Sequence, residues 1–209
     1  MAPFRIAVNP NTGNVYVINV QDGTVSVISP SNQIITTIPV GNTPQDIAVN
    51  PNTGNVYVTN IFSNNISVIS GSTNQVIATI PVSPTHYLAV NRNTANVYVP
   101  NCFSNTVSVI SGSTNQVINT VPVGTCPEGV AVNPNTGDVY VVNRDSNTVS
   151  VISPRDQVVA TIPVGQPSPG PQARSFRDAF VGSLALAPNT SILSTWLPSR
   201  SSASVVAIL

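Results

Sequence analysis

The feature that most constrains this chain is one phrase that occurs four times at nearly constant spacing. The copies read AVNPNTGNVYVIN from Ala7, AVNPNTGNVYVTN from Ala48, AVNRNTANVYVPN from Ala89 and AVNPNTGDVYVVN from Ala131. They begin 41, 41 and 42 residues apart. A fixed period of this length is typical of repeat architectures, in which each repeat is a small unit that packs against its neighbours. The fold must therefore accommodate four copies of one unit.

Each repeat contains four short β-type segments and no helical apolar period. In the second copy these segments are rich in Val, Ile, Thr and Tyr, are bounded by Gly, Pro, Asn and Ser, and cover 46–49, 55–60, 65–70 and 75–82. Val56 and Val58 alternate with Tyr57, so the strand is apolar on both faces, unlike a strand with one solvated face. Four such strands in a repeat of this length predict an all-β chain of four-stranded antiparallel β-propeller blades.

The turn between the first two segments supports this reading. In Asn50–Gly54, proline fixes φ, asparagine folds back on its own backbone, and glycine accepts the positive φ needed to re-enter a strand. The third copy has Arg92 and Ala95 in place of that proline and glycine. We expect this substitution to cost the turn some stability, because a Cβ disfavours positive φ.

The phrase Tyr57-Val58-Thr59-Asn60 resembles the motif of the YVTN-type β-propeller repeat family, and the other copies match it in register over residues 4–165. The resemblance implies a propeller and relatives among bacterial and archaeal surface or secreted proteins, with propeller lactonases and lyases as more distant relatives. It transfers no catalytic motif. The chain departs from the family in size, since those propellers usually have about seven blades.

The repeats suggest the organisation of the chain. Four YVTN-type blades are expected within 1–165, at about 4–40, 45–82, 86–123 and 128–164. A proline-rich irregular insertion is expected at 166–181, and a degenerate partial fifth blade at 182–209, where LALAPNT echoes the repeated phrase. Either five blades close into a ring, or the chain is an open fragment of a larger ring that can self-associate through exposed blade faces and edges.

Composition narrows the classes of partner. Charged residues make up 7% of the chain, the formal net charge is zero, and every basic residue is an arginine. This balance argues against nucleic-acid binding and against a polybasic membrane surface. No run is long and apolar enough for a transmembrane segment, and no secretory signal is recognisable. The many Asn, Ser and Thr residues, together with the resemblance, favour an extracellular or cell-surface location.

The two cysteines, Cys102 and Cys126, both fall in loops at the junction of the third and fourth repeats. Propeller geometry brings these loops together, so the pair is a disulfide candidate, and a disulfide would imply an oxidising compartment. The alternative is two unpaired small residues. Two cysteines without a histidine at ligand spacing predict no metal site, and no cofactor is expected.

Propellers usually bind ligands through the loops that enter the innermost strands and the loops between the second and third strands. In this chain those loops contain the ligand-binding candidates Asp46, Phe62, His86, Tyr87, Phe103, Glu128, Arg144 and Asp145. Phe62 and Phe103 share one repeat offset and form either a ligand or sugar platform or caps on the sheet beneath. His86, the only histidine, is either a general acid or base or a surface or packing residue. Arg144 and Asp145 also fit a solvated surface pair.

The leading functional hypothesis is a non-catalytic propeller scaffold that presents a recognition surface to a protein, glycan or small ligand. No catalytic residue is assigned, because the few ionisable residues form no reactive constellation. The first alternative is a lactonase- or lyase-like enzyme with His86, Glu128 and Asp46 at the channel mouth. The second is a truncated propeller fragment without independent function. The fold alone does not decide among them.

Overall fold

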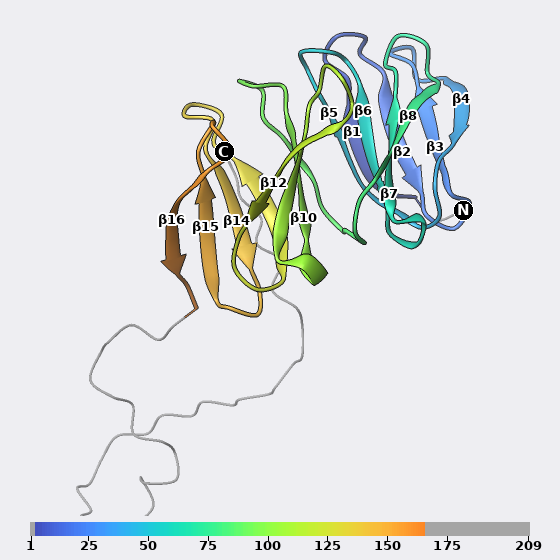
Figure 1. The fold of residues 1–209 in the computed structure, drawn as a ribbon. Helices are drawn as coiled ribbons and strands as arrows, with labels where there is room; N and C mark the ends of the chain where they lie inside the picture. Colours follow the sequence, from blue (N-terminus) through green and yellow to red (C-terminus); the bar gives the residue numbers. More distant parts are fainter. Residues whose placement is uncertain (1–2, 166–209) are drawn as a thin grey trace, which may run out of the picture. The chain divides into compact units, whose positions relative to one another are not determined.

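A computed structural model describes residues 3–165, which fold into four sheets, each of four antiparallel strands in sequence order (Figure 1). Blade 1 comprises β1 (Pro3–Val8), β2 (Val15–Asn19), β3 (Thr24–Ile28) and β4 (Ile34–Pro39). Blade 2 comprises β5 (Pro44–Val49), β6 (Val56–Asn60), β7 (Asn65–Ile69) and β8 (Val76–Pro81). Blade 3 comprises β9 (Ala89–Val90), β10 (Val97–Asn101), β11 (Thr106–Ile110) and β12 (Val117–Pro122). Blade 4 comprises β13 (Pro127–Val132), β14 (Val139–Asn143), β15 (Thr148–Ile152) and β16 (Val158–Pro163).

This architecture confirms the predicted all-β fold of four-stranded antiparallel blades. The expected insertion at 166–181 and the expected partial blade at 182–209 lie outside the described residues. Within residues 3–165 there is no helix with the length and apolar character needed to cross a membrane. Two single-turn helices, η1 (Ile61–Ser63) and η2 (Cys102–Ser104), join the second and third strands of blades 2 and 3.

The turn between the first and second strands forms as the sequence predicts. In blade 2 the Gly54 amide donates to the Asn50 carbonyl at 2.8 Å, and the Asn52 amide donates to the Asn50 side chain at 3.0 Å. Gly54 has φ 74°, in the left-handed region that glycine enters without steric cost. Ala95 occupies the same place in blade 3 with φ 62°, so the substitution keeps the turn shape and forces an alanine into a disfavoured conformation.

The asparagine that ends the repeated phrase stabilises the second hairpin of each blade. In blade 4 the Asn143 amide donates to the hydroxyls of Thr148 and Ser150, each at 2.9 Å. Asn19, Asn60 and Asn101 make the corresponding bonds in the other blades. The side chain therefore crosses from the end of the second strand onto the third, which explains why this position is asparagine in every copy.

The core lies between blades, as the apolar character of both strand faces predicts. Val56, Tyr57 and Val58 are all fully buried. Val56 and Val58 pack with Tyr16 of blade 1, whereas Tyr57 packs on the opposite face with residues of blade 3. Each buried valine contributes roughly 1.5–3 kcal/mol, so blades stabilise one another through their faces.

Polar contacts repeat at each of these interfaces. Tyr16, Tyr57 and Tyr98 each donate a hydroxyl hydrogen bond of 2.7 Å to the turn between the third and fourth strands of the next blade. Asn9, Asn50 and Asn91 each donate an amide hydrogen bond to a backbone carbonyl of the next blade's first turn, at 2.9, 2.7 and 2.8 Å. The three interfaces are thus built from the same contacts, one repeat apart.

Blade 3 departs from the others at its first strand. β9 has two residues, whereas β1, β5 and β13 each have six. The segment leading into β9, Ser83–Leu88, is one residue shorter than its counterpart in blade 2. This shorter connection takes Thr85, His86 and Tyr87 out of the ladder and leaves them as a loop beside the neighbouring blades.

Candidate functional site

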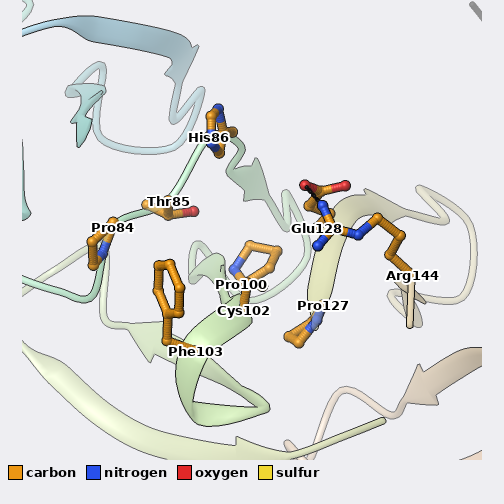
Figure 2. Close-up of a pocket in the computed structure, with 9 residues that line it drawn as sticks. All are labelled: Pro84, Thr85, His86, Pro100, Cys102, Phe103, Pro127, Glu128 and Arg144. Carbon is orange, nitrogen blue, oxygen red and sulfur yellow. Dashed lines mark hydrogen bonds and ion pairs between the residues drawn. The ribbon is translucent and has the colours of Figure 1, made fainter. Parts of the chain in front are cut away.

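A cavity of about 170 Å³ lies between blades 3 and 4 (Figure 2). It is formed by loops and strand ends of these two blades and by the segment that enters blade 3. Its lining residues are Pro84, Thr85, His86, Pro100, Cys102, Phe103, Pro127, Glu128 and Arg144. Four of the ligand-binding candidates are among them, namely His86, Phe103, Glu128 and Arg144, as is the disulfide candidate Cys102. The structure therefore brings together residues that are up to 58 positions apart in the chain.

A disulfide between Cys102 and Cys126 holds one wall of this cavity. Cys102 begins η2, and Cys126 lies in the loop that leads into β13. The Cys126 amide also donates to the Asn105 side chain at 2.9 Å. These two connections fasten the loop of blade 3 to the entry of blade 4, so the Phe103 and Pro127 sides of the cavity keep a fixed separation.

The apolar part of the cavity consists of the Phe103 ring and three prolines. Phe103 is 80% exposed, and in Figure 2 its ring lies with Pro84 on one side of the cavity, opposite Glu128 and Arg144. An aromatic ring that is this exposed contributes little to the core beneath it. It is available to stack against a flat apolar face of a ligand.

The polar part of the cavity is an ion-pair group on blade 4. Arg144 donates from Nη1 to Glu128 Oε1 at 2.8 Å and from Nε to Asp145 Oδ1 at 2.9 Å. The hydrogen bond that Arg144 donates to Asp145 and the charge of Glu128 raise the pKa of the Arg144 guanidinium above its usual value. The carboxylates hold the guanidinium in place, and the group presents both donors and acceptors to the cavity.

His86 reaches the cavity from the loop before β9. The buried Thr85 beside it donates a hydroxyl hydrogen bond to the Tyr87 carbonyl at 3.1 Å, which fixes the loop. The His86 and Tyr87 rings lie 6.1 Å apart at a tilted angle. Among residues 3–165, no hydrogen bond or ion pair joins the His86 imidazole to another side chain.

Asp46 and Tyr87 belong to a second cluster, on the first strands of blades 1 and 2 and the loop before β9. The Arg5 guanidinium lies 4.0 Å from the Asp46 carboxylate and 5.8 Å from the Tyr87 ring centre. Asp46 accepts a hydrogen bond from the Leu88 amide at 3.2 Å. Burial raises the pKa of Asp46 despite the opposing effects of the Leu88 amide and Arg5.

The structure thus divides the sequence candidates into groups. Asp46 and Tyr87 form the second cluster, Asp145 lies beside the cavity as the partner of Arg144, and Phe62 does not line the cavity. Phe62 occupies the same position on η1 as Phe103 on η2 and is 74% exposed. Within the described part of the chain, no group of three or more His, Cys, Asp or Glu side chains is placed to hold a metal ion.

Two contributions were missed from the sequence. Arg5 occupies the same repeat position as Asp46, 41 residues earlier, so the repeat alignment alone could have indicated an ion pair between adjacent first strands. The lining residues Pro84, Thr85, Pro100 and Pro127 carry no chemical signal. They are found only when the loops of successive blades are placed side by side.

Comparison of the sequence with protein families gives a match to the NHL repeat over residues 125–152, a range that contains the first three strands of blade 4. No curated protein matches the sequence significantly. The NHL match covers a small part of the chain and supports a propeller-type repeat, but it does not support the YVTN type specifically.

Solved structures show the same fold. Hydrazine synthase from Kuenenia stuttgartiensis has a TM-score of 0.69 and 20% identity, over 77% of this chain and 48% of the other. Virginiamycin B lyase from Staphylococcus aureus has a TM-score of 0.66 and 14% identity, over 79% of this chain and 56% of the lyase. The dihydro-heme d1 dehydrogenase NirN has a TM-score of 0.63 and 13% identity, over 79% of this chain and 38% of the dehydrogenase.

The chain spans about half the length of these structures or less, and the low identities bear on the fold alone. Three observations indicate the same fold. They are the four repeats, the interfaces between successive blades and the likeness to the solved structures. The described part of the chain has a β-propeller fold of repeated four-stranded antiparallel blades.

Proposed function

We propose that the chain is a non-catalytic recognition propeller that binds one sugar ring of a glycan in the cavity beside Phe103. The observation that carries this proposal is the combination of an exposed aromatic ring with a fixed carboxylate–guanidinium pair in one small cavity. The Phe103 ring offers a face for the apolar C–H groups of a sugar. Glu128 accepts hydrogen bonds from hydroxyl groups, and Arg144 donates them.

The size of the cavity supports a single ring rather than a whole ligand. At about 170 Å³ it is smaller than the roughly 300–1,000 Å³ of pockets that enclose drug-sized molecules. A glycan would place one residue in the cavity and leave the rest outside. The low charge of the chain also favours a neutral ligand, and the disulfide favours an extracellular or cell-surface location.

Binding can be measured by saturation-transfer NMR with glucose, galactose, mannose and N-acetylglucosamine as probes. We expect at least one of them to receive saturation from the protein. Phe103→Ala should abolish this signal, whereas Phe62→Ala, which removes an equally exposed ring outside the cavity, should leave it unchanged. Equal loss in both variants, or no transfer to any of the four sugars, would rule out the sugar site.

A second candidate function is a lactonase- or lyase-like activity. It is favoured by the presence of His86 and Glu128 in the same cavity and by a lyase among the structures that share the fold. In this function His86 would serve as the general acid or base. Turnover of a lactone or cyclic depsipeptide substrate that disappears in His86→Ala, with binding retained, would select the enzyme over the scaffold.

A further inference from the structure

The two faces of each blade are different, and each interface joins one kind to the other. The Tyr face of a blade carries its tyrosine and the apolar residue of its fourth strand; in blade 1 these are Tyr16 and Ile38. The Val face carries apolar residues of the first, second and third strands; in blade 2 these include Ile47, Val56 and Ile69. The Tyr face of each blade packs on the Val face of the next, at all three interfaces.

Within residues 3–165, no other blade packs on the Tyr face of blade 4. Tyr140 is 37% exposed and Val142 and Ile162 are each 45% exposed. The corresponding side chains of blade 1, Tyr16 and Ile18, are fully buried, and Ile38 is 4% exposed. The same residue types thus occupy the same positions as in an interface, and they face solvent.

Blade 1 presents the complementary face. Ile6 is 65% exposed and Val8 is 58% exposed, whereas Ile47, which corresponds to Ile6 in blade 2, is 6% exposed. Both open faces are apolar, and neither places a charged side chain at these positions. On each face the exposed apolar side chains lie next to one another, whereas an ordinary surface carries them singly. Such contiguous apolar patches mark sites of association.

The polar partners of an interface are also present on the two open faces. Asn32 of blade 1 corresponds to Asn74, which accepts the Tyr16 hydroxyl, and has the same left-handed backbone, with φ 61° against 54°. Gly13 corresponds to Gly54, whose carbonyl accepts the Asn9 amide. On blade 4 the donors are Tyr140 and Asn133, and neither donates to a side chain or carbonyl within residues 3–165.

We infer that the Tyr face of blade 4 binds the Val face of blade 1 in a second copy of this chain. Tyr140 then donates to Asn32 of the second copy, and Asn133 donates to its Gly13 carbonyl, which continues the interface already formed three times within the chain. The contact is heterologous, because the two faces differ. Two such contacts in one pair use both open faces of both chains.

Light scattering after gel filtration tests this contact in the full chain. Ile6→Arg disrupts only the Val face of blade 1, and Val142→Arg disrupts only the Tyr face of blade 4. Both positions are solvent-exposed, so each chain should fold, as checked by circular dichroism. Ile118→Arg, at a 55% exposed position on the outer strand of blade 3, is the matched control.

We expect the wild type and Ile118→Arg to be oligomeric and each face variant alone to be monomeric. An equimolar mixture of the two face variants should form a dimer, because each retains the face that the other has lost. A monomeric wild type overturns the inference. An Ile6→Arg chain that stays oligomeric, or a mixture that stays monomeric, overturns head-to-tail contact.

Discussion

Each tyrosine of the repeated phrase joins two blades through one hydroxyl group. Tyr57 is fully buried and donates to Asn115 at 2.7 Å across the interface between blades 2 and 3. Tyr57→Phe keeps the ring and removes the bond, so we expect the free energy of unfolding to fall by about 0.5–1.5 kcal/mol. Urea unfolding measures this change. In a double-mutant cycle with Asn115→Ala, a coupling energy near zero would contradict the assigned bond.

Asp46 should make stability depend on pH in the acidic range. Its pKa is raised in the folded chain, chiefly by burial, so the folded state holds a proton that the unfolded state releases. Stability should therefore be greatest below the ordinary aspartate pKa of about 3.9 and fall as the pH rises through the raised value. Asp46→Asn should remove that part of the slope.

Thermal unfolding between pH 3 and pH 7, with exposed Asp22→Asn as the comparison variant, measures the effect. A wild type whose melting temperature rises over that interval relative to Asp46→Asn would show that Arg5 and the Leu88 amide outweigh burial at this carboxylate.

Single residues also show where sequence reasoning stops. His86 and Glu128 could be assigned to loops on one side of the blades, because their repeat positions are known. The meeting of His86 with Phe103, Glu128 and Arg144 in one cavity involves the shortened loop at Ser83–Leu88. A one-residue deletion changes where a loop lies but adds no residue whose chemistry would indicate a site. The three lining prolines likewise give no indication of a site in the sequence.

At the scale of the element, the first turn of each blade carries a strict backbone requirement. Ala95 holds φ 62° where the other three copies have glycine. Ala95→Gly should stabilise the chain by roughly 1 kcal/mol, because a left-handed non-glycine residue costs about 1–2 kcal/mol. The reverse change, Gly54→Ala, should destabilise it, since φ is 74° and the new Cβ would lie 3.3 Å from the Asn11 amide. Chemical denaturation of both variants measures whether the free energy of unfolding rises in Ala95→Gly and falls in Gly54→Ala.

Strands were the most predictable elements, for a physical reason. Both faces of β6 are buried between blades, which is why Val56, Tyr57 and Val58 are apolar in succession. The Asn-Pro-Asn-Thr-Gly turn fixes where the strand starts. β9 was not predicted to be short. Its phrase, Leu88–Val90, reads like that of the other first strands, and only the geometry of the preceding loop removes it from the ladder.

At the scale of the whole molecule, the disulfide links the third blade to the entry of the fourth. Cys102 and Cys126 close a loop with a sequence separation of 24, for which the chain-entropy model gives about 3 kcal/mol of stabilisation. The double variant Cys102→Ser/Cys126→Ser should lose stability of that order in urea unfolding. Adding a reductant to the wild type should reproduce the loss, and alkylation before reduction should modify neither cysteine.

Because every junction between blades uses the same positions, the unit that evolution can add or remove is a whole repeat. Recombination between two copies of the phrase inserts or deletes about 41 residues and still places a tyrosine hydroxyl opposite a turn side chain and an asparagine amide opposite a carbonyl. A substitution inside one copy, by contrast, must remain compatible with the contacts that the copy makes to the blades on either side. Blade number in such a lineage should therefore change in whole-repeat jumps, while the contacts between blades stay nearly constant.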